Sequence, residues 1–197
     1  MLDWLIQVDR DLFLFLNGFH NDGWDGIMIW ISGKTTWWPF YLSLLGFAAW
    51  KKQWQLLPFI LAVVLVITLA DQTSVHLFKE VIRRPRPCFE EGVKELMHLV
   101  GNCSEKHKYG FISSHASNIF AVAVLFALWI RKGWFTVLML SWAFLVGYSR
   151  IYLGKHYPGD VLAGALWGAA LGWLIFLLFR TILRQLPKRW WINRERS

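Results

Sequence analysis

The sequence predicts an all-α bundle of five to six membrane-spanning helices, preceded by an N-terminal amphipathic helix. Hydrophobic residues make up 56% of the 197 residues, the chain has 14 Trp, and its mean hydropathy is +0.38. Soluble domains of this size normally contain far less apolar and aromatic material. A span needs roughly 20 mostly apolar residues, so five or six spans use most of the chain. We therefore expect a single membrane domain over residues 1–197.

The first 19 residues have the pattern of a surface helix. Apolar residues recur at three- and four-residue steps, and polar residues occupy the opposite side; the apolar set is Met1, Leu5, Val8, Leu12, Phe15 and Phe19, and the polar set is Asp3, Gln7, Arg10 and Asn17. This periodicity predicts that residues 1–20 form an amphipathic helix lying on the membrane surface.

The apolar segments that follow predict the spans. Gly33, Lys34 and Pro39 interrupt the first segment, so a short interfacial piece is expected before a span over about 35–50. Further spans are predicted at 55–79, 114–131, 134–150 and 160–184. The last of them contains small residues at four-residue steps, which allow another helix to approach closely; they are Gly164, Ala165, Gly168, Ala169 and Gly172.

Basic residues in the connections predict the orientation. Lys51, Lys52, Arg131, Lys132 and the basic tail at 185–197 would lie on the cytoplasmic side. The 80–113 loop and the 150–160 turn would then face the other side. Because topology and phosphate binding account for the net charge of +8, we expect no nucleic-acid partner. The sequence leaves the oligomeric state open.

The 80–113 loop is too long for a simple connection, which indicates a functional role. Val93, Leu96, Met97 and Val100 could form one amphipathic turn that rests on the lipid. Cys88 and Cys103 could pair in an oxidising compartment, and two free thiols are an equally open reading.

Three polar clusters are predicted to meet at this face of the membrane. The first runs from Lys79 to Arg86 and Pro87, the second from Phe111 to His115, and the third from Ser149 to Asp160. Arginine forks and a lysine suit phosphate binding. A carboxylate four residues from a histidine, across a Pro-Gly turn, can fix the imidazole tautomer and leave the other nitrogen free to attack.

Together the clusters resemble the tripartite signature of the type 2 phosphatidic acid phosphatase (PAP2) superfamily, which reads Lys-x6-Arg-Pro, Pro-Ser-Gly-His and Ser-Arg-x5-His-x3-Asp. The first and third elements are complete. The second departs from the pattern, because Ile112 replaces the proline and Ser114 replaces the glycine. Serine keeps the backbone N–H, but a positive φ would be costly at this position.

The resemblance implies a lipid phosphatase that works through a phosphohistidine intermediate. His156 would be the nucleophile, Asp160 would orient its ring, and His115 would be the general acid and then the general base. The phosphate would be bound by Lys79, Arg86, Ser113, Ser114 and Arg150. Arg84 is a candidate for a second phosphate, with a solvent-facing charge as the equal alternative. We expect no metal and no cofactor.

Undecaprenyl diphosphate is the substrate expected first, with phosphatidylglycerophosphate, phosphatidate and lipid A phosphate as close competitors. A phosphotransferase of the same fold remains open, since only the products distinguish it from a hydrolase. A protein that merely binds anionic lipids would make no use of the spacing between His156 and Asp160. The expected location is a bacterial inner membrane, with the active site on the periplasmic or extracellular face.

Overall fold

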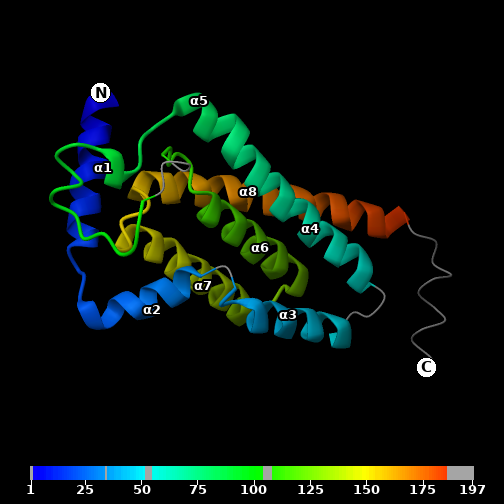
Figure 1. Cartoon of the computed structure of the whole chain (residues 1–197). Coiled ribbons are helices and arrows are strands. Elements are labelled where there is room, and N and C mark those ends of the chain that lie inside the picture. The colour runs from blue at the N-terminus through cyan, green and yellow to red at the C-terminus, as the bar shows by residue number, and fades with distance from the viewer. Residues whose placement is uncertain (1, 34, 52–54, 104–107, 186–197) are drawn as a thin grey trace.

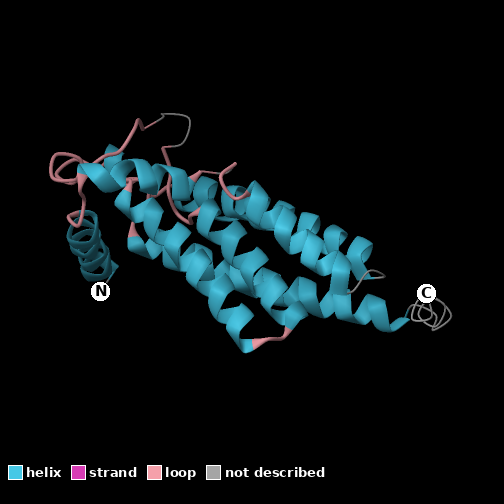
Figure 2. Cartoon of the chain, turned by 90° about the horizontal axis from the view of Figure 1, so that it is seen from below, coloured by secondary structure: helices cyan, strands magenta, loops and turns pink. Residues whose placement is uncertain are grey.

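The computed structural model describes residues 2–33, 35–51, 55–103 and 108–185. These residues form helices and loops without a strand, as expected (Figures 1 and 2). Long helices lie side by side, and α1 crosses one end of the bundle. Several predicted features lie outside the described residues: Met1, Lys34, Lys52 and the basic tail beyond Gln185, with Lys188, Arg189, Arg194 and Arg196.

Helix α1 (Leu2–Asn17) turns a mixed face toward the protein, with Arg10 and Asn17 of the predicted polar side, while Asp3 and Gln7 are exposed. Asn17 is buried, and Asp9 and Arg10 bond to residues of other segments. Leu5, Val8, Leu12 and Phe15 are exposed on the outer side. An apolar stripe that faces outward fits a helix lying on lipid, so its interfacial position remains our proposal.

Helices α2 (Asp22–Ser32) and α3 (Trp38–Lys51) run one after the other along the bundle (Figure 1). With 14 residues, α3 is roughly 21 Å long, which is shorter than a hydrocarbon core of about 30 Å. The described helix is thus shorter than a full span, and residues 52–54 after it lie outside the described part of the chain, so the span predicted over 35–50 remains a prediction.

Three helices in the described part of the chain are long and apolar enough to cross a membrane. They are Leu56–Ile82, Gly133–Tyr152 (α7) and Pro158–Gln185 (α8). Helix α6 (Ser114–Ile130) is apolar but slightly shorter. The number of five to six spans therefore remains a prediction.

The helix Leu56–Ile82 changes its winding near the site. It begins as α4 (Leu56–Thr73), continues as a π-helix, η2 (Ser74–Lys79), and ends as α5 (Glu80–Ile82). Arg83 adopts a left-handed conformation (φ 52°), after which Pro85 and Pro87 prevent any continuation. π-Helical turns occur mainly at functional sites, and this one ends at Lys79.

Helices α6 and α8 pack closely enough to require the predicted glycines. A Cβ atom on Gly164, Gly168 or Gly172 would lie 2.5, 2.0 or 2.5 Å from a backbone oxygen of α6. Those oxygens belong to Ser113, Ser117 and Ala121, which are also four residues apart. The stripe of small residues therefore sets the distance between the two helices and, with it, the position of Ser113 beside α8.

The loop between α5 and α6 folds back over α1. It contains a 3₁₀ turn, η3 (Pro87–Phe89), and a disulfide between Cys88 and Cys103, whose Cα atoms are 6.5 Å apart. Val93 is buried and packs in a cluster with Phe13 of α1 and Tyr157. Because Val93 is buried against the protein, the expectation that this turn rests on lipid is wrong for Val93. Leu96, in contrast, is exposed.

The close packing predicts a strong effect of one added methyl group. Gly168→Ala should lower the free energy of unfolding by about 1–3 kcal/mol, because the nearest atoms are backbone and cannot rotate away. Gly46→Ala in α3 is the matched control, since a Cβ there has nothing within 4 Å. Thermal unfolding in detergent measures both; equal melting temperatures for the two variants would contradict this packing.

The disulfide predicts a second effect on stability. Closing a loop of 15 residues contributes about 3 kcal/mol in the chain-entropy model, so Cys88→Ser should lower the melting temperature. Cys103→Ser and the double variant should match it, because each variant removes the same bond. Thiol labelling of the unfolded wild type should require prior reduction; full labelling without a reductant would exclude the bond.

Candidate active site

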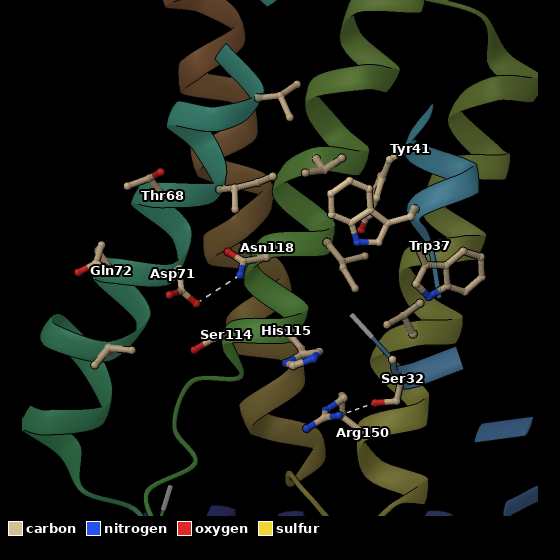
Figure 3. Close-up of a pocket in the computed structure, with 18 of the residues that line it drawn as sticks. Ser32, Trp37, Tyr41, Thr68, Asp71, Gln72, Ser114, His115, Asn118 and Arg150 are labelled. Atoms are coloured by element: carbon tan, nitrogen blue, oxygen red, sulfur yellow. Dashed lines mark hydrogen bonds between the residues drawn. The ribbon is translucent and has the colours of Figure 1, made fainter. Parts of the chain in front are cut away.

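A cavity of about 990 Å³ lies among α3, α4 and α6. At one end it is lined by most of the residues that the sequence singled out: Lys79, Arg86, Ser114, His115, Arg150 and His156. The rest of its wall is largely apolar, with Leu45, Val63 and Phe126 at the far end. The three clusters thus meet at one end of a cavity that continues into the bundle (Figure 3).

The turn between α7 and α8 brings His156 and Asp160 together. Pro158 begins α8, so Asp160 sits in its first turn. His156 is 2% exposed and Asp160 is 0% exposed. The Nδ1 atom of His156 lies 3.5 Å from Oδ2 of Asp160. Since Nδ1 faces the carboxylate, Nε2 is the ring nitrogen available for chemistry in the cavity.

His156 is held in its neutral form. Burial lowers its pKa well below the usual 6.5, and the nearby charges of Arg86, Arg150 and Lys79 lower it further. Only a neutral imidazole has a lone pair with which to attack. The environment therefore favours the nucleophilic form of this side chain.

Gly110, which the sequence analysis did not single out, passes directly behind this pair. Its N–H donates to the carbonyl of Arg84 at 2.8 Å. A Cβ atom at this position would lie 2.9 Å from Oδ2 of Asp160 and 3.1 Å from Cγ of Arg86. Only glycine leaves room for both side chains, and a lone glycine in a long loop gives no sequence signal for that role.

The three basic phosphate-binding candidates bond to neutral oxygen atoms. Lys79 donates from Nζ to the Ser114 hydroxyl at 2.6 Å, and Arg86 donates from Nε to the carbonyl of Tyr109 at 3.3 Å. Arg150 donates to the hydroxyl of Ser32 (Figure 3). Ser32 precedes the interrupted segment and was not predicted to belong to the site.

Ser114 lies at the junction of α6 and the π-helix. The Ser74 hydroxyl, which the sequence analysis also missed, donates to the Ser114 hydroxyl at 2.6 Å. Ser114 is the first helical residue of α6. Arg83 and Arg131 are the non-glycine residues with positive φ in the described part of the chain, so serine in place of glycine causes no such strain at 114.

Ser113 has a different position from the one predicted. Its hydroxyl accepts a hydrogen bond from the N–H of Ala116 at 3.4 Å, which caps α6. The residue is fully buried, and it is not among the residues that line the cavity. The expected contact of this hydroxyl with phosphate is therefore not supported. Ser113 instead donates its N–H to the carbonyl of Asp160 at 2.9 Å.

Arg84 is bonded to two carboxylates. Its Nη1 atom lies 2.6 Å from Asp9 and 3.2 Å from Asp160, and its guanidinium stands 4.1 Å from the ring centre of Tyr157. It is thus committed within the protein rather than facing solvent, and its proposed contact with a second phosphate is not supported.

Helix α1 is attached to the site at several points. Asp9 also accepts the N–H of Gly159 at 2.7 Å, where a Cβ would collide with the Asp9 carboxylate. Arg10 pairs with Glu90, which accepts a hydrogen bond from Tyr157. The charged face of α1 thus fixes the start of α8.

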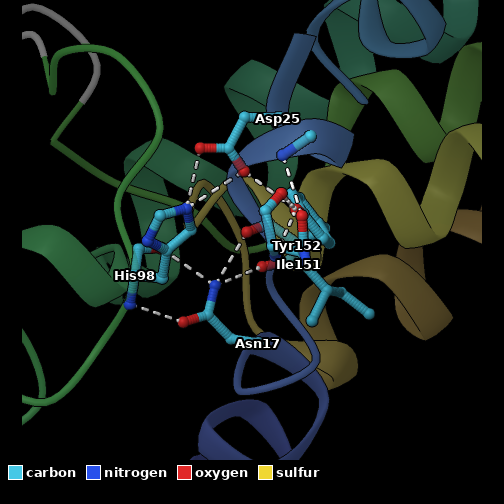
Figure 4. A network of polar contacts seen from close by, with 7 residues as sticks. Asn17, Asp25, His98, Ile151 and Tyr152 are labelled. Carbon is cyan, nitrogen blue, oxygen red and sulfur yellow. Dashed lines mark hydrogen bonds and ion pairs between the residues drawn. The ribbon is translucent and has the colours of Figure 1, made fainter. Parts of the chain in front are cut away.

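A second polar cluster locks the corner between α1 and α2 onto the end of α7 (Figure 4). Asn17 donates to the carbonyls of Ile151 and Tyr152 and accepts the N–H of His98. Asp25 accepts the Tyr152 hydroxyl at 2.8 Å and lies 3.0 Å from Nε2 of His98. The α5–α6 loop is thereby held near its middle, at His98.

The described residues contain no group of three or more His, Cys, Asp or Glu side chains that could hold a metal ion.

The chain was compared with known families and proteins. The model of the PAP2 superfamily matches residues 35–184. A lipid A 4′-phosphatase of Bacteroides thetaiotaomicron is 36% identical over 188 residues, covering 94% of this chain and 83% of the relative. An undecaprenyl-diphosphatase of Bacillus subtilis is 32% identical over 110 residues, covering 55% of this chain and 52% of the relative.

Among solved structures, a transmembrane PAP2-type phosphatidylglycerolphosphate phosphatase from Bacillus subtilis has the same fold. It is 22% identical, with a TM-score of 0.67, and the similarity covers 93% of this chain and 88% of that one. The matched residues include all three clusters that meet at the cavity. The chain therefore belongs to the PAP2 superfamily.

Proposed function

We propose that this protein is a lipid A phosphatase, which removes a phosphate from an acylated glucosamine through a phosphohistidine intermediate. The observation that carries the proposal is the cavity itself: His156 and three cations line one end, and the other end is an apolar space suited to acyl chains. A lipid phosphate has the same two parts.

The choice of lipid A over undecaprenyl diphosphate rests on the relatives. The similarity to a lipid A 4′-phosphatase extends over most of both chains. The similarity to an undecaprenyl-diphosphatase extends over about half of each. The substrate expected first from the sequence is therefore the less well supported of the two.

The reaction begins with attack by Nε2 of His156 on phosphorus. The P–O bond to the sugar breaks, and the leaving oxygen takes a proton from His115. Asp160 stabilises the positive charge that the ring of His156 acquires. Lys79, Arg86 and Arg150 bind the phosphoryl oxygens, on which negative charge is concentrated in the transition state.

The second step regenerates the enzyme. His115, now neutral, accepts a proton from water, and the water oxygen attacks phosphorus. The P–N bond to His156 breaks, inorganic phosphate leaves, and the imidazole returns to its neutral form. A transferase would use another acceptor in place of water at this step.

The face of the membrane follows from the charges of the connections. Arg131 lies at the end of the bundle away from the site, as does the start of the C-terminal tail. Because basic connections stay in the cytoplasm, we propose a periplasmic active site in a bacterial inner membrane.

His156→Ala tests the proposed function. The variant should remain folded, but it should release no phosphate from lipid A and form no acid-labile phosphoenzyme, because the attacking nitrogen is absent. His76→Gln is the control, since His76 is exposed and pairs with Glu80 rather than lining the cavity. Phosphate is measured without an added acceptor and with a chelator. Turnover by His156→Ala would disprove the mechanism, and a wild type that needs an acceptor would be a transferase.

Asp9→Asn tests the influence of α1 on the site. Without the Asp9 charge, Arg84 pairs with Asp160 alone, so Asp160 stabilises charged His156 less. We expect kcat to fall about tenfold, equivalent to about 1.4 kcal/mol, with little change in KM. Because the pKa of His156 falls further, the acid limb of the kcat/KM profile should move to lower pH.

Asp11→Asn is the matched control for this prediction, because Asp11 lies on the exposed side of the same helix. It should leave both kcat and the pH profile unchanged. If Asp9→Asn lowers the melting temperature without moving the profile, Asp9 serves stability alone.

A further inference from the structure

A layer of hydrogen-bonding side chains separates the basic end of the cavity from its apolar end. It consists of Asp71 and Gln72 on α4 and Asn118 on α6, which we call the polar layer. In Figure 3 these residues lie between Ser114 and His115 on one side and Thr68 on the other. Asn118 is one helical turn, roughly 5.4 Å, beyond Ser114.

Placing the polar layer within a membrane-spanning segment costs free energy. Asp71 is within the candidate span Leu56–Ile82, where a carboxylate normally has a functional reason. Its Oδ1 atom accepts one long hydrogen bond, 3.4 Å, from Nδ2 of Asn118. A carboxylate can accept several more.

Asn118 adds an acceptor that is not used within the described part of the chain. With Nδ2 directed at Asp71, its Oδ1 atom is buried and has no hydrogen-bond partner there. A buried acceptor without a partner costs about 1–3 kcal/mol. Asp71 and Asn118 thus line the cavity with unused acceptor capacity: Oδ1 of Asn118 has no partner in the described part of the chain, and the Asp71 carboxylate accepts one long hydrogen bond.

We infer that the polar layer binds the hydroxyl or amide N–H donors of the substrate's sugar. The inference rests on the proposed function, because it takes the phosphate to lie at the basic end. Groups one turn further along the cavity would then belong to the part of the lipid between the phosphate and the acyl chains. An acylated glucosamine has O–H and N–H donors in that part.

Two of the other candidate lipids, phosphatidate and undecaprenyl diphosphate, lack these donors. Phosphatidate has ester oxygens between its phosphate and its chains, and these only accept hydrogen bonds. A polyprenyl chain is apolar from its first carbon, so it would leave Asp71 and Asn118 without partners. A site built to bind donors discriminates strongly against a ligand that has none. The polar layer therefore favours a lipid with donors next to its phosphate over phosphatidate and undecaprenyl diphosphate.

The experiment compares three variants on three lipids. Asp71→Asn and Asn118→Leu should lower kcat/KM for the phosphorylated acyl-glucosamine about tenfold, mainly through KM, and leave phosphatidate and undecaprenyl diphosphate unchanged or improved. Thr68→Val is the matched control: it lines the same cavity, but its hydroxyl bonds to Val64 within its own helix. It should change none of the three.

An equal loss on all three lipids would overturn the inference, because it would mean that the Asp71–Asn118 contact only joins α4 to α6. Binding of the acyl-glucosamine phosphate to His156→Ala, with and without Asn118→Leu, gives a second measurement that needs no turnover. If the wild type hydrolyses none of the lipids, the proposed function fails, and the binding result still decides the role of the polar layer.

Discussion

The site depends on one buried carboxylate, that of Asp160. It lies 3.5 Å from His156, accepts the N–H of Tyr157, and pairs with Arg84. Its backbone carbonyl accepts the N–H of Ser113, which caps α6. A buried carboxylate is stable only when several donors surround it. The donors to the carboxylate come from the α5–α6 loop and the α7–α8 turn, and the backbone bond to Ser113 adds the start of α6, so this one residue joins the three clusters.

Much of this arrangement could be predicted from the sequence. The positions of Lys79, Arg86, Arg150 and His156 near helix ends predicted that these side chains meet, because apolar periodicity indicates which helix ends coincide, and all four line one cavity. The glycines of α8 also indicated close packing, because their four-residue repeat can be read from the sequence of α8 without knowing which helix packs against it. These features are patterns within short stretches of sequence, so they can be recognised without knowing which distant segments come into contact.

Other features depend on contacts between distant segments, which no local pattern records. Ser32, Ser74 and Gly110 reach the site from three separate segments, and Asp9 does so from a helix that reads as a simple surface anchor. The amphipathic pattern of α1 predicted a helix with an apolar face, and Leu5, Val8, Leu12 and Phe15 of that face are exposed. Which polar residues on the inner face would be bonded, and to what, could not be deduced. Ser113 caps α6 and Arg84 pairs with Asp9 and Asp160, so the structure gives no support to the phosphate contacts expected for these two side chains.

The basic residues that line the cavity have different hydrogen-bond partners from Arg84, which has a structural role. Lys79, Arg86 and Arg150 bond to hydroxyl or carbonyl oxygens, whereas Arg84 bonds to two carboxylates. A neutral acceptor orients a cation without cancelling its charge, whereas a carboxylate orients the cation and also cancels its charge. The three cations at the cavity thus keep their charge for an incoming phosphate, and the same charge lowers the pKa of His156. Arg84, neutralised by Asp9 and Asp160, holds the carboxylate beside His156 in place and adds little to the field that draws the substrate in.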